Sequence, residues 1–294
     1  MTSYTEIKDD DYPQAPNEED CCGNGCDPCI FDVHKRLVEE WEKKKSDKTT
    51  KLPQKNFLSL IQYQKFIVDS ILKSSEDCIL INLNCGLENM NKTVLMLPGQ
   101  HVIIRLRTIS KPYTPIFWSE RSMRLLVKLY PNGVASDSFR KIKINDELQI
   151  RGPYGDFKYQ SNSFKHLVMF NIGSGIAAHY PIASSIINND SENTKVHMIS
   201  GFRSLQHVPL KDEVRLLTDF WNFECTLCLS QSSNEHLTGC KIIDSKLNEE
   251  IINNFLDKYS VDSTLVLICG TTQFNENIER IVKERNFSHR YVFK

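Results

Sequence analysis

Residues His166 to Ile172 form a continuous apolar run that ends directly in Gly173-Ser174-Gly175, and a helix-like stretch, Ile176 to Ile187, follows. An apolar run of this length bounded by glycine is typical of a strand buried on both faces of a parallel sheet. Small residues between such a strand and a helix N-terminus let a dinucleotide phosphate approach the free N–H groups of the helix. A single Gly-x-Gly is weak evidence, so the interpretation depends on the rest of the chain.

Strand-like and helix-like segments alternate through the rest of the carboxy-terminal half. Strands are expected at Lys195 to Gly201, Cys225 to Ser230 and Thr264 to Gly270, and helices at Leu210 to Phe220, Asn248 to Tyr259 and Phe274 to Arg285. This alternation predicts a doubly wound parallel sheet over residues 161–294. Ligands of such sheets bind beyond the carboxyl ends of the strands, where Gly173, Gly201 and Cys269-Gly270 are expected.

The preceding part of the chain has a shorter period. Its strand-length apolar segments are Phe57 to Ile71, Asp77 to Leu83, His101 to Leu106, Met123 to Tyr130 and Glu147 to Arg151. Short strands at this spacing, separated by Gly, Pro and Asn turns, are typical of a small antiparallel barrel. We therefore expect a barrel domain over residues 51–160.

One segment of the expected barrel, Pro112-Tyr113-Thr114-Pro115, has an unusual composition. Each proline fixes its own φ and restrains the residue before it, so the segment should be rigid and extended. A phenol and a hydroxyl held in this way could stack on a planar ring and donate a hydrogen bond to it, with Lys111 available for a phosphate. The alternative is a simple turn, which such a sequence also favours.

The amino-terminal 50 residues differ in kind. Nine acidic residues and one lysine lie between Met1 and Asp32, and we expect residues 1–20 to be disordered. Four cysteines follow within nine residues, Cys21, Cys22, Cys26 and Cys29, a thiolate-rich loop that suits zinc or an iron–sulfur cluster. The alternative is a redox-labile or turn-forming loop. A helix is expected from Ile30 to Lys45, ahead of a basic linker.

Composition excludes several classes of protein. With 36 Lys and Arg against 37 Asp and Glu, the chain lacks the basic excess of a protein that tracks nucleic-acid phosphates. It contains no apolar run of about 18 residues, so no membrane-spanning segment is expected. Ten cysteines without a secretory signal indicate reduced thiols in a cytoplasmic compartment.

A series of motifs spans both expected domains in a fixed order. They are Gly99-Gln100-His101, Pro112 to Pro115, Val127-Lys128-Leu129-Tyr130-Pro131-Asn132-Gly133, Arg151-Gly152-Pro153-Tyr154-Gly155, Gly173 to Ile176, Cys269-Gly270 and the ending Tyr291-Val292-Phe293. In this order they resemble the ferredoxin-NADP reductase superfamily and, within it, the NADH-cytochrome b5 reductase group. The cysteine-rich segment and its helix resemble the amino-terminal module of a cytochrome b5 reductase-like subgroup.

The resemblance implies that the barrel binds FAD and that the parallel sheet binds a nicotinamide nucleotide. By this resemblance Tyr113 stacks on the flavin, Thr114 hydrogen-bonds near flavin N5, Cys269 lies beside the nicotinamide, and Thr114 and Cys269 form the catalytic pair. Cofactor contacts are implied at Lys111, Pro112, Tyr113, Thr114, Val127, Lys128, Tyr130, Gly133, Val134, Ala135, Ser136, Gly173, Ser174, Gly175, Cys269, Gly270 and Phe293.

The sequence departs from the family pattern at two places. Lys111 stands where arginine is usual, and lysine keeps the charge without the bidentate fork, so weaker FAD binding is expected. Ala177-Ala178 stands where Thr-Pro is usual. Both departures fall at positions that bear on the catalytic turnover expected from the resemblance.

The expected function is therefore that of an FAD-dependent reductase. It would take a hydride from NADH, with NADPH as an alternative donor, and pass single electrons to a haem protein such as cytochrome b5. The alternatives are a reductase for a quinone or an iron–sulfur partner, and a catalytically silent scaffold that binds FAD or a metal. A cytoplasmic location is expected, with peripheral membrane contact through the acceptor as an open alternative.

Overall fold

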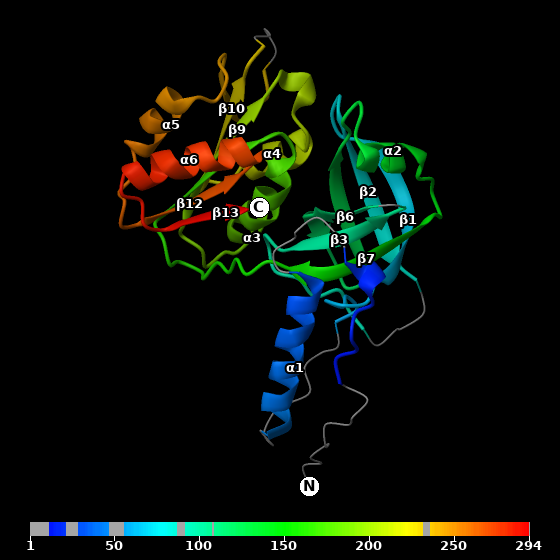
Figure 1. Ribbon diagram of the computed structural model, residues 1–294. Coiled ribbons are helices and arrows are strands. Elements are labelled where there is room, and N and C mark those ends of the chain that lie inside the picture. Colours follow the sequence, from blue (N-terminus) through cyan, green and yellow to red (C-terminus); the bar gives the residue numbers. More distant parts are fainter. Residues whose placement is uncertain are drawn as a thin grey trace.

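The computed structural model describes residues 12–21, 29–46, 56–86, 92–107, 109–231 and 236–293. Two sheets of different kind lie side by side, and the helix α1 (Ile30–Ser46) extends away from the barrel (Figure 1). The antiparallel sheet comes first in the chain and the parallel sheet second. This arrangement confirms the predicted fold class, whereas the predicted domain boundaries at residues 51–160 and 161–294 stay a prediction.

The first sheet has seven strands in the order β4-β3-β7-β1-β2-β6-β5. All of its neighbouring pairs are antiparallel. The bounds are β1 (Gln64–Lys73), β2 (Cys78–Cys85), β3 (His101–Leu106), β4 (Ile109–Tyr113), β5 (Pro115–Trp118), β6 (Ser122–Lys128) and β7 (Glu147–Tyr154), with the helix α2 (Val134–Lys141) between β6 and β7.

Two edge strands bring the sheet into a closed shape. The strands β4 and β5 stand at opposite ends of the strand order, yet Tyr113 ends one and Pro115 begins the other. Because only Thr114 separates them, the two edges must meet within about 7 Å, and the sheet curls into a barrel. Both prolines of the segment occupy edge strands, where a missing N–H donor is tolerated.

The second sheet has six parallel strands in the order β11-β10-β9-β8-β12-β13. The order reverses at β8, with β9 on one side and β12 on the other, which makes the sheet doubly wound. The bounds are β8 (His166–Ile172), β9 (Lys195–Phe202), β10 (Phe223–Leu229), β11 (Cys240–Ile243), β12 (Thr264–Cys269) and β13 (Arg290–Phe293).

Helices cover both faces of the parallel sheet, as Figure 1 shows. The helices α3 (Ile176–Ile187) and α4 (Lys211–Leu217) bury one set of apolar side chains, including Ile182 and Val214. The helices α5 (Glu249–Leu256) and α6 (Thr272–Glu284) bury another on the opposite face. The β8 strand is buried on both faces, which explains why its sequence is a continuous apolar run.

The described part of the amino-terminal segment packs against the barrel. Asp20 pairs with Arg105 of β3 at 2.8 Å, and Val33 of α1 is buried in a cluster with Ile103 and Tyr154. Asp20 thus has a cationic partner, and Tyr12 packs its ring edge-on against Trp41 at 5.1 Å. The expected disorder of residues 1–20 stays a prediction. Residues 1–11 lie outside the described part of the chain.

Several sequence-based boundaries need correction. The strand expected from Phe57 begins only at Gln64, because residues 56–63 form bends and a single bridge. Four strands, β4, β5, β11 and β13, and the short helix α2 were not among the elements expected from the sequence, although residues 112–115 were expected to be extended. They are four to eight residues long, too short for a periodic pattern to stand out.

Candidate functional site

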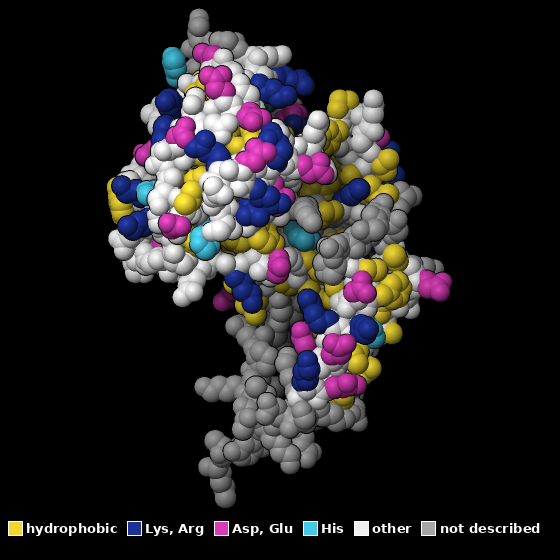
Figure 2. All heavy atoms as spheres, turned by 60° about the vertical axis from the view of Figure 1, so that its left-hand side comes forward, with side chains coloured by type: hydrophobic (Ala, Val, Ile, Leu, Met, Phe, Trp, Pro, Cys, Tyr) yellow, Lys and Arg dark blue, Asp and Glu magenta, His cyan; other side chains and the backbone are white. Residues whose placement is uncertain are grey.

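A cleft of about 2830 Å³ lies between the barrel and the parallel sheet. In the space-filling view of Figure 2 the two parts form separate masses with a notch between them. The barrel contributes the segment around β4 and β5 and the beginning of α2, and the sheet contributes the carboxyl ends of β8, β9 and β12. The volume exceeds the usual range of about 300 to 1,000 Å³ for small-molecule pockets, so there is room for more than one large ligand.

The β4–β5 connection forms one wall of the cleft. Lys111 and Pro112 are exposed, whereas Tyr113 is partly buried with its ring edge-on to Phe139 at 5.2 Å. Burial raises the pKa of the Tyr113 phenol, so this side chain stays neutral. The lining residues from Lys111 to Thr114 thus present, in sequence order, a cation, a rigid proline in extended chain, a flat ring and a hydroxyl.

The beginning of α2 lies on the same wall. Gly133 is its N-cap and makes no side-chain cap, and the N–H groups of the first helical turn have no carbonyl partner within the helix. The Ser136 hydroxyl oxygen accepts a hydrogen bond from the Tyr130 N–H at 2.8 Å, which leaves its own hydrogen free to donate. A helix end of this kind suits a phosphate.

Lys128 forms the floor of the cleft with Asp77. Its ammonium lies 3.0 Å from the Asp77 carboxylate and 5.7 Å from the centre of the Tyr130 ring. Burial alone would raise the pKa of Asp77, but the hydrogen bond and charge of Lys128, with help from Cys78 and Ser75, hold that pKa below its usual value. The pair is therefore ionised, and Lys128 is held in place within the cleft.

The opposite wall is the turn between β8 and α3. Gly173 has φ of +55°, which favours glycine, and a carbon added to it would lie 3.3 Å from the Lys128 ammonium. A side-chain carbon at Gly175 would lie 2.3 Å from the carbonyl oxygen of Cys269. The turn therefore needs glycine at both positions, one for backbone conformation and one for close approach to β12.

Cys269 ends β12 next to this turn and lines the cleft. Burial raises the pKa of its thiol to about 12, so it is a protonated, neutral group near pH 7. Such a thiol is a poor nucleophile. Gly270 follows it and also lines the cleft.

Aromatic residues at the carboxyl end of the chain close the cleft where the two sheets meet. Phe293 packs against Phe157 at 5.4 Å and Tyr291 at 4.8 Å between ring centres. The Tyr291 hydroxyl donates to Asp156 Oδ1 at 2.6 Å, and this bond is the main reason that the pKa of Asp156 lies below its usual value. Phe293 was predicted as a cofactor contact and Tyr291 was noted only as part of the closing motif, whereas Phe157 and Asp156 were not predicted.

The structure gathers nearly all of the residues expected from the sequence in this one cleft. Among the predicted cofactor contacts only Val127 does not line it, because its side chain is buried in the barrel core at 1% exposure. The predicted residues that line the cleft are Lys111, Pro112, Tyr113, Thr114, Lys128, Tyr130, Gly133, Val134, Ala135, Ser136, Gly173, Ser174, Gly175, Cys269, Gly270 and Phe293.

Family models match in the same order as the parts of the structure. An oxidoreductase FAD-binding domain model matches residues 65–159, and an oxidoreductase NAD-binding domain model matches residues 169–280. The NADH-cytochrome b5 reductase 1 of Lodderomyces elongisporus is 31% identical over 219 residues, which are 71% of this chain and 70% of the yeast protein. The chain belongs to the NADH-cytochrome b5 reductase family.

Other members of the family match over a greater length. The human protein named NADH-cytochrome b5 reductase-like is 28% identical over 285 residues, 91% of this chain and 89% of the human protein. A model described as oxidoreductase-like protein, N-terminal, matches residues 9–50, the segment with the amino-terminal cysteines and all of α1. The resemblance stated for the amino-terminal module is thereby confirmed.

Solved structures of family members and their neighbours have the same fold. The cytochrome b5 reductase domain of Ulva prolifera nitrate reductase matches with a TM-score of 0.68 at 17% identity, over 81% of this chain and all of that one. The CS-b5R domains of human Ncb5or, in an NAD+ form, match with a TM-score of 0.69 at 22% identity, over 79% of this chain and 69% of that one.

The amino-terminal cysteines have no described metal site. Cys21 is exposed and Cys29 is partly buried, whereas Cys22 and Cys26 lie outside the described residues. Within the described ranges no group of three or more His, Cys, Asp or Glu side chains could hold a metal ion. The described residues therefore give no support to the prediction of zinc or an iron–sulfur cluster at these cysteines.

One buried polar pair beside the cleft was also missed by the sequence analysis. Asn171 and His179 lie 3.2 Å apart between Nδ2 and Nδ1, and both are fully buried. Burial lowers the pKa of His179 to about 3, so the ring is neutral. His179 packs edge-on against Phe293 at 5.6 Å, which links the start of α3 to the carboxyl end of the chain.

No helix among the described residues is long and apolar enough to span a bilayer.

Proposed function

We propose that this protein is a flavoprotein reductase that takes a hydride from NADH onto FAD and then passes single electrons to a haem protein such as cytochrome b5. The observation that carries the proposal is the shared cleft. The rigid Tyr113-Thr114 segment of the barrel and the Gly173-to-Gly175 turn of the sheet line the same cavity. Family membership and the matches to FAD- and NAD-binding domain models support the two cofactors.

The residues of the barrel wall fit FAD. Tyr113 offers a partly exposed ring for stacking, Lys111 offers a cation, and the first turn of α2 offers N–H groups and the Ser136 hydroxyl for a pyrophosphate. The Thr114 hydroxyl would fix the orientation of the ring system by a hydrogen bond. Bound FAD would supply the chemistry that side chains lack, since a flavin accepts two electrons and releases them singly.

The opposite wall fits the dinucleotide. Gly173 and Gly175 keep the turn free of side chains, so that a pyrophosphate could approach the start of α3. Cys269 would lie beside the nicotinamide as a neutral thiol and set its position by packing. The aromatic group around Phe293 would keep water from the part of the cleft where the two sheets meet.

The test uses the purified full-length protein. We expect a yellow protein whose flavin absorbance bleaches on anaerobic addition of NADH and returns when oxidised cytochrome b5 is added. If the flavin absorbance returns only with a quinone or only with an iron–sulfur protein, the acceptor belongs to that class instead. A colourless protein that binds neither FAD nor NADH would overturn the proposal in favour of a scaffold without redox activity.

A further inference from the structure

The dinucleotide wall of the cleft continues past the glycine turn to the ends of the neighbouring strands. Four polar side chains line it there: Arg203 and His207 after β9, Ser230 after β10, and Lys246 just before α5. None of these four was assigned a role above. Two of them carry a full positive charge, and the carboxylate of the cleft lining that follows them most closely in sequence is Glu249, three residues after Lys246.

The position of Arg203 is informative because of the sheet topology. The strand β8 leads into the glycine turn, and β9 is the next strand in chain and in space. In open α/β sheets of this kind the end of the second strand faces the adenosine ribose. A carboxylate at that end hydrogen-bonds a free 2′-hydroxyl, whereas an arginine there accommodates a 2′-phosphate. Here Arg203 is the first residue after β9.

Backbone contacts hold these groups close to one another. The Arg203 carbonyl accepts hydrogen bonds from the Gln231 N–H at 2.7 Å and from the Ser230 hydroxyl at 3.4 Å. On the other side, a carbon added to Gly201 would lie 3.3 Å from Cβ of Leu247, so the residue after Lys246 packs directly on the end of β9. Arg203 and Ser230 are thus joined directly, and Lys246 precedes the residue that packs on the same strand end.

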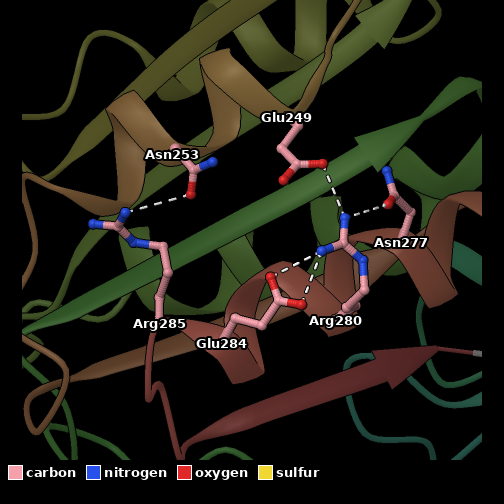
Figure 3. A network of polar contacts seen from close by, with 6 residues as sticks. All are labelled: Glu249, Asn253, Asn277, Arg280, Glu284 and Arg285. Atoms are coloured by element: carbon pink, nitrogen blue, oxygen red, sulfur yellow. Dashed lines mark hydrogen bonds and ion pairs between the residues drawn. The ribbon is translucent and has the colours of Figure 1, made fainter.

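Charge balance in this region favours an anion. Arg203 and Lys246 are exposed, and within the described ranges neither forms an ion pair or a side-chain hydrogen bond. The nearby cleft carboxylate Glu249 is already bound to Arg280 at 2.9 Å, and Arg280 also holds Glu284, as Figure 3 shows. Glu276, a further cleft carboxylate, lies one turn from Arg280 on α6. The cations at the end of β9 thus remain available to a ligand.

We infer that this end of the cleft is a 2′-phosphate subsite, in which Arg203 and Lys246 bind the phosphate that distinguishes NADPH from NADH and Ser230 adds a hydroxyl. NADPH is then a donor for the same cleft, bound more tightly than NADH. The inference rests on the proposed function for the location of the dinucleotide. Arg203 serves as the planar guanidinium that suits phosphate, and Lys246 as a second point charge.

The test measures binding without turnover, using adenosine bisphosphates in calorimetric titrations of the full-length protein. Adenosine 2′,5′-bisphosphate should bind about tenfold more tightly than 5′-AMP, because it adds charge-assisted hydrogen bonds. Adenosine 3′,5′-bisphosphate has the same charge with the phosphate in another position, and it should show a much smaller gain. The gain should also shrink as salt is raised.

Substitutions test whether Arg203 and Lys246 cause this gain in affinity. Arg203→Ala and Lys246→Ala should each weaken the 2′,5′-bisphosphate by about five- to tenfold and leave 5′-AMP within about twofold. The matched control is Lys195→Ala, an exposed lysine at the opposite, amino-terminal end of β9, which should change neither affinity. Equal affinities of the wild-type protein for the 2′,5′-bisphosphate and 5′-AMP would overturn the inference.

The two proposals fail in distinguishable ways. In one outcome the protein prefers the 2′,5′-bisphosphate, Arg203→Ala loses that preference, and neither NADH nor NADPH bleaches the flavin. This outcome would support the subsite and overturn the proposed reductase activity. Bleaching by NADH together with tighter binding of 5′-AMP would do the reverse. Binding of none of the three nucleotides by a folded protein would overturn both.

Discussion

The Tyr291 hydroxyl donates a hydrogen bond to Asp156 Oδ1 at 2.6 Å, across 135 residues of sequence. Tyr291 belongs to β13 of the parallel sheet, and Asp156 follows β7 of the barrel, so the bond joins the two halves of the molecule. Phe157, the neighbour of Asp156, packs against Tyr291 at 5.0 Å and against Phe293. This contact sets how the two cleft walls face each other.

Removal of the bond should therefore loosen the contact between the two halves. Tyr291→Phe keeps the ring and removes the donor, and we expect a loss of about 1 kcal/mol in the free energy of unfolding. Asp156→Ala should cost a similar amount, and the double variant should cost less than the sum. Urea unfolding of the four proteins measures this, and strict additivity would mean that the two side chains do not interact in solution.

Lys111 provides a test of the FAD wall. It is exposed at the cleft, and arginine at this position would add a planar, bidentate group. We expect Lys111→Arg to lower the dissociation constant of FAD about fivefold, or about 1 kcal/mol, and to raise the melting temperature with bound FAD. Lys111→Met, the control without charge, should weaken FAD. An arginine variant with unchanged affinity would place Lys111 away from the phosphates.

Substitutions of Thr114 and Cys269 should have different effects on the bound flavin. Cys269→Ala should leave a yellow protein with a normal spectrum whose reduction by NADH is about tenfold slower, a barrier increase of about 1.4 kcal/mol, because alignment of the two ligands is disturbed. Thr114→Ala should alter the flavin spectrum or FAD content as well. Rapid mixing under anaerobic conditions follows the bleaching directly. A Cys269→Ala protein reduced at the wild-type rate would leave Cys269 a packing residue only.

The close approach at Gly175 predicts a large effect from a single methyl group. In Gly175→Ala the new carbon would lie 2.3 Å from the Cys269 carbonyl oxygen, a distance at which backbone must move. We expect destabilisation by about 1 to 3 kcal/mol together with weaker nucleotide binding. Gly86→Ala is the matched control, because no atom lies within 4 Å of its added carbon, and its effect should stay within about 0.5 kcal/mol. Denaturant midpoints of the two variants decide the point.

His197 makes stability depend on pH. It lies between the Tyr259 hydroxyl at 2.7 Å and the Thr226 hydroxyl at 2.9 Å, and burial, with smaller contributions from Lys258 and Lys241, lowers its pKa to about 4. In the unfolded chain the pKa of histidine is about 6.5, so between these values the unfolded chain binds a proton that the folded protein does not. The stability that depends on neutral His197 is complete above about pH 6.5 and is lost as pH falls toward about 4.

Denaturation at several pH values tests this dependence. The loss attributable to His197 should reach up to about 3 kcal/mol, and His101 and His179 act in the same direction because burial lowers their pKa values too. His197→Gln should therefore reduce the slope of the free energy of unfolding against pH. The reduction corresponds to at most one bound proton, about 1.4 kcal/mol per pH unit. The comparison at about pH 8 is the control, where both states hold a neutral imidazole. Parallel curves for the two proteins would contradict the prediction.

Much of the architecture could be predicted because its signals are local. The strand β8 and the helix α3 have the bounds that the apolar run and the following pattern predicted. The alternation of strands and helices was enough to predict a doubly wound sheet, and the motif order was enough to predict the family. The strands β11 and β13 were missed because four residues at the end of a sheet carry little periodicity of their own.

Val127 illustrates the limit for the candidate site. It lies within a motif of which Lys128, Tyr130 and Gly133 line the cleft. Successive residues of a strand point to opposite faces, and the side chain of Val127 points into the barrel core. The pairing of Lys128 with Asp77, at the start of a different strand, depends on the register between β2 and β6. Register and strand order are properties of the folded sheet.

The sequence by itself determined the class of the longer periodic elements, the glycine turn after β8 and the rigid extended form of residues 112–115, because backbone sterics and side-chain periodicity act over a few residues. The tertiary structure alone decided that β4 and β5 are opposite edges of one sheet joined at Thr114, and that Tyr291 reaches Asp156. It also placed Arg203 and Lys246 at one strand end. Such contacts arise only when barrel closure and sheet order bring distant residues together, since no local preference encodes a partner many residues away.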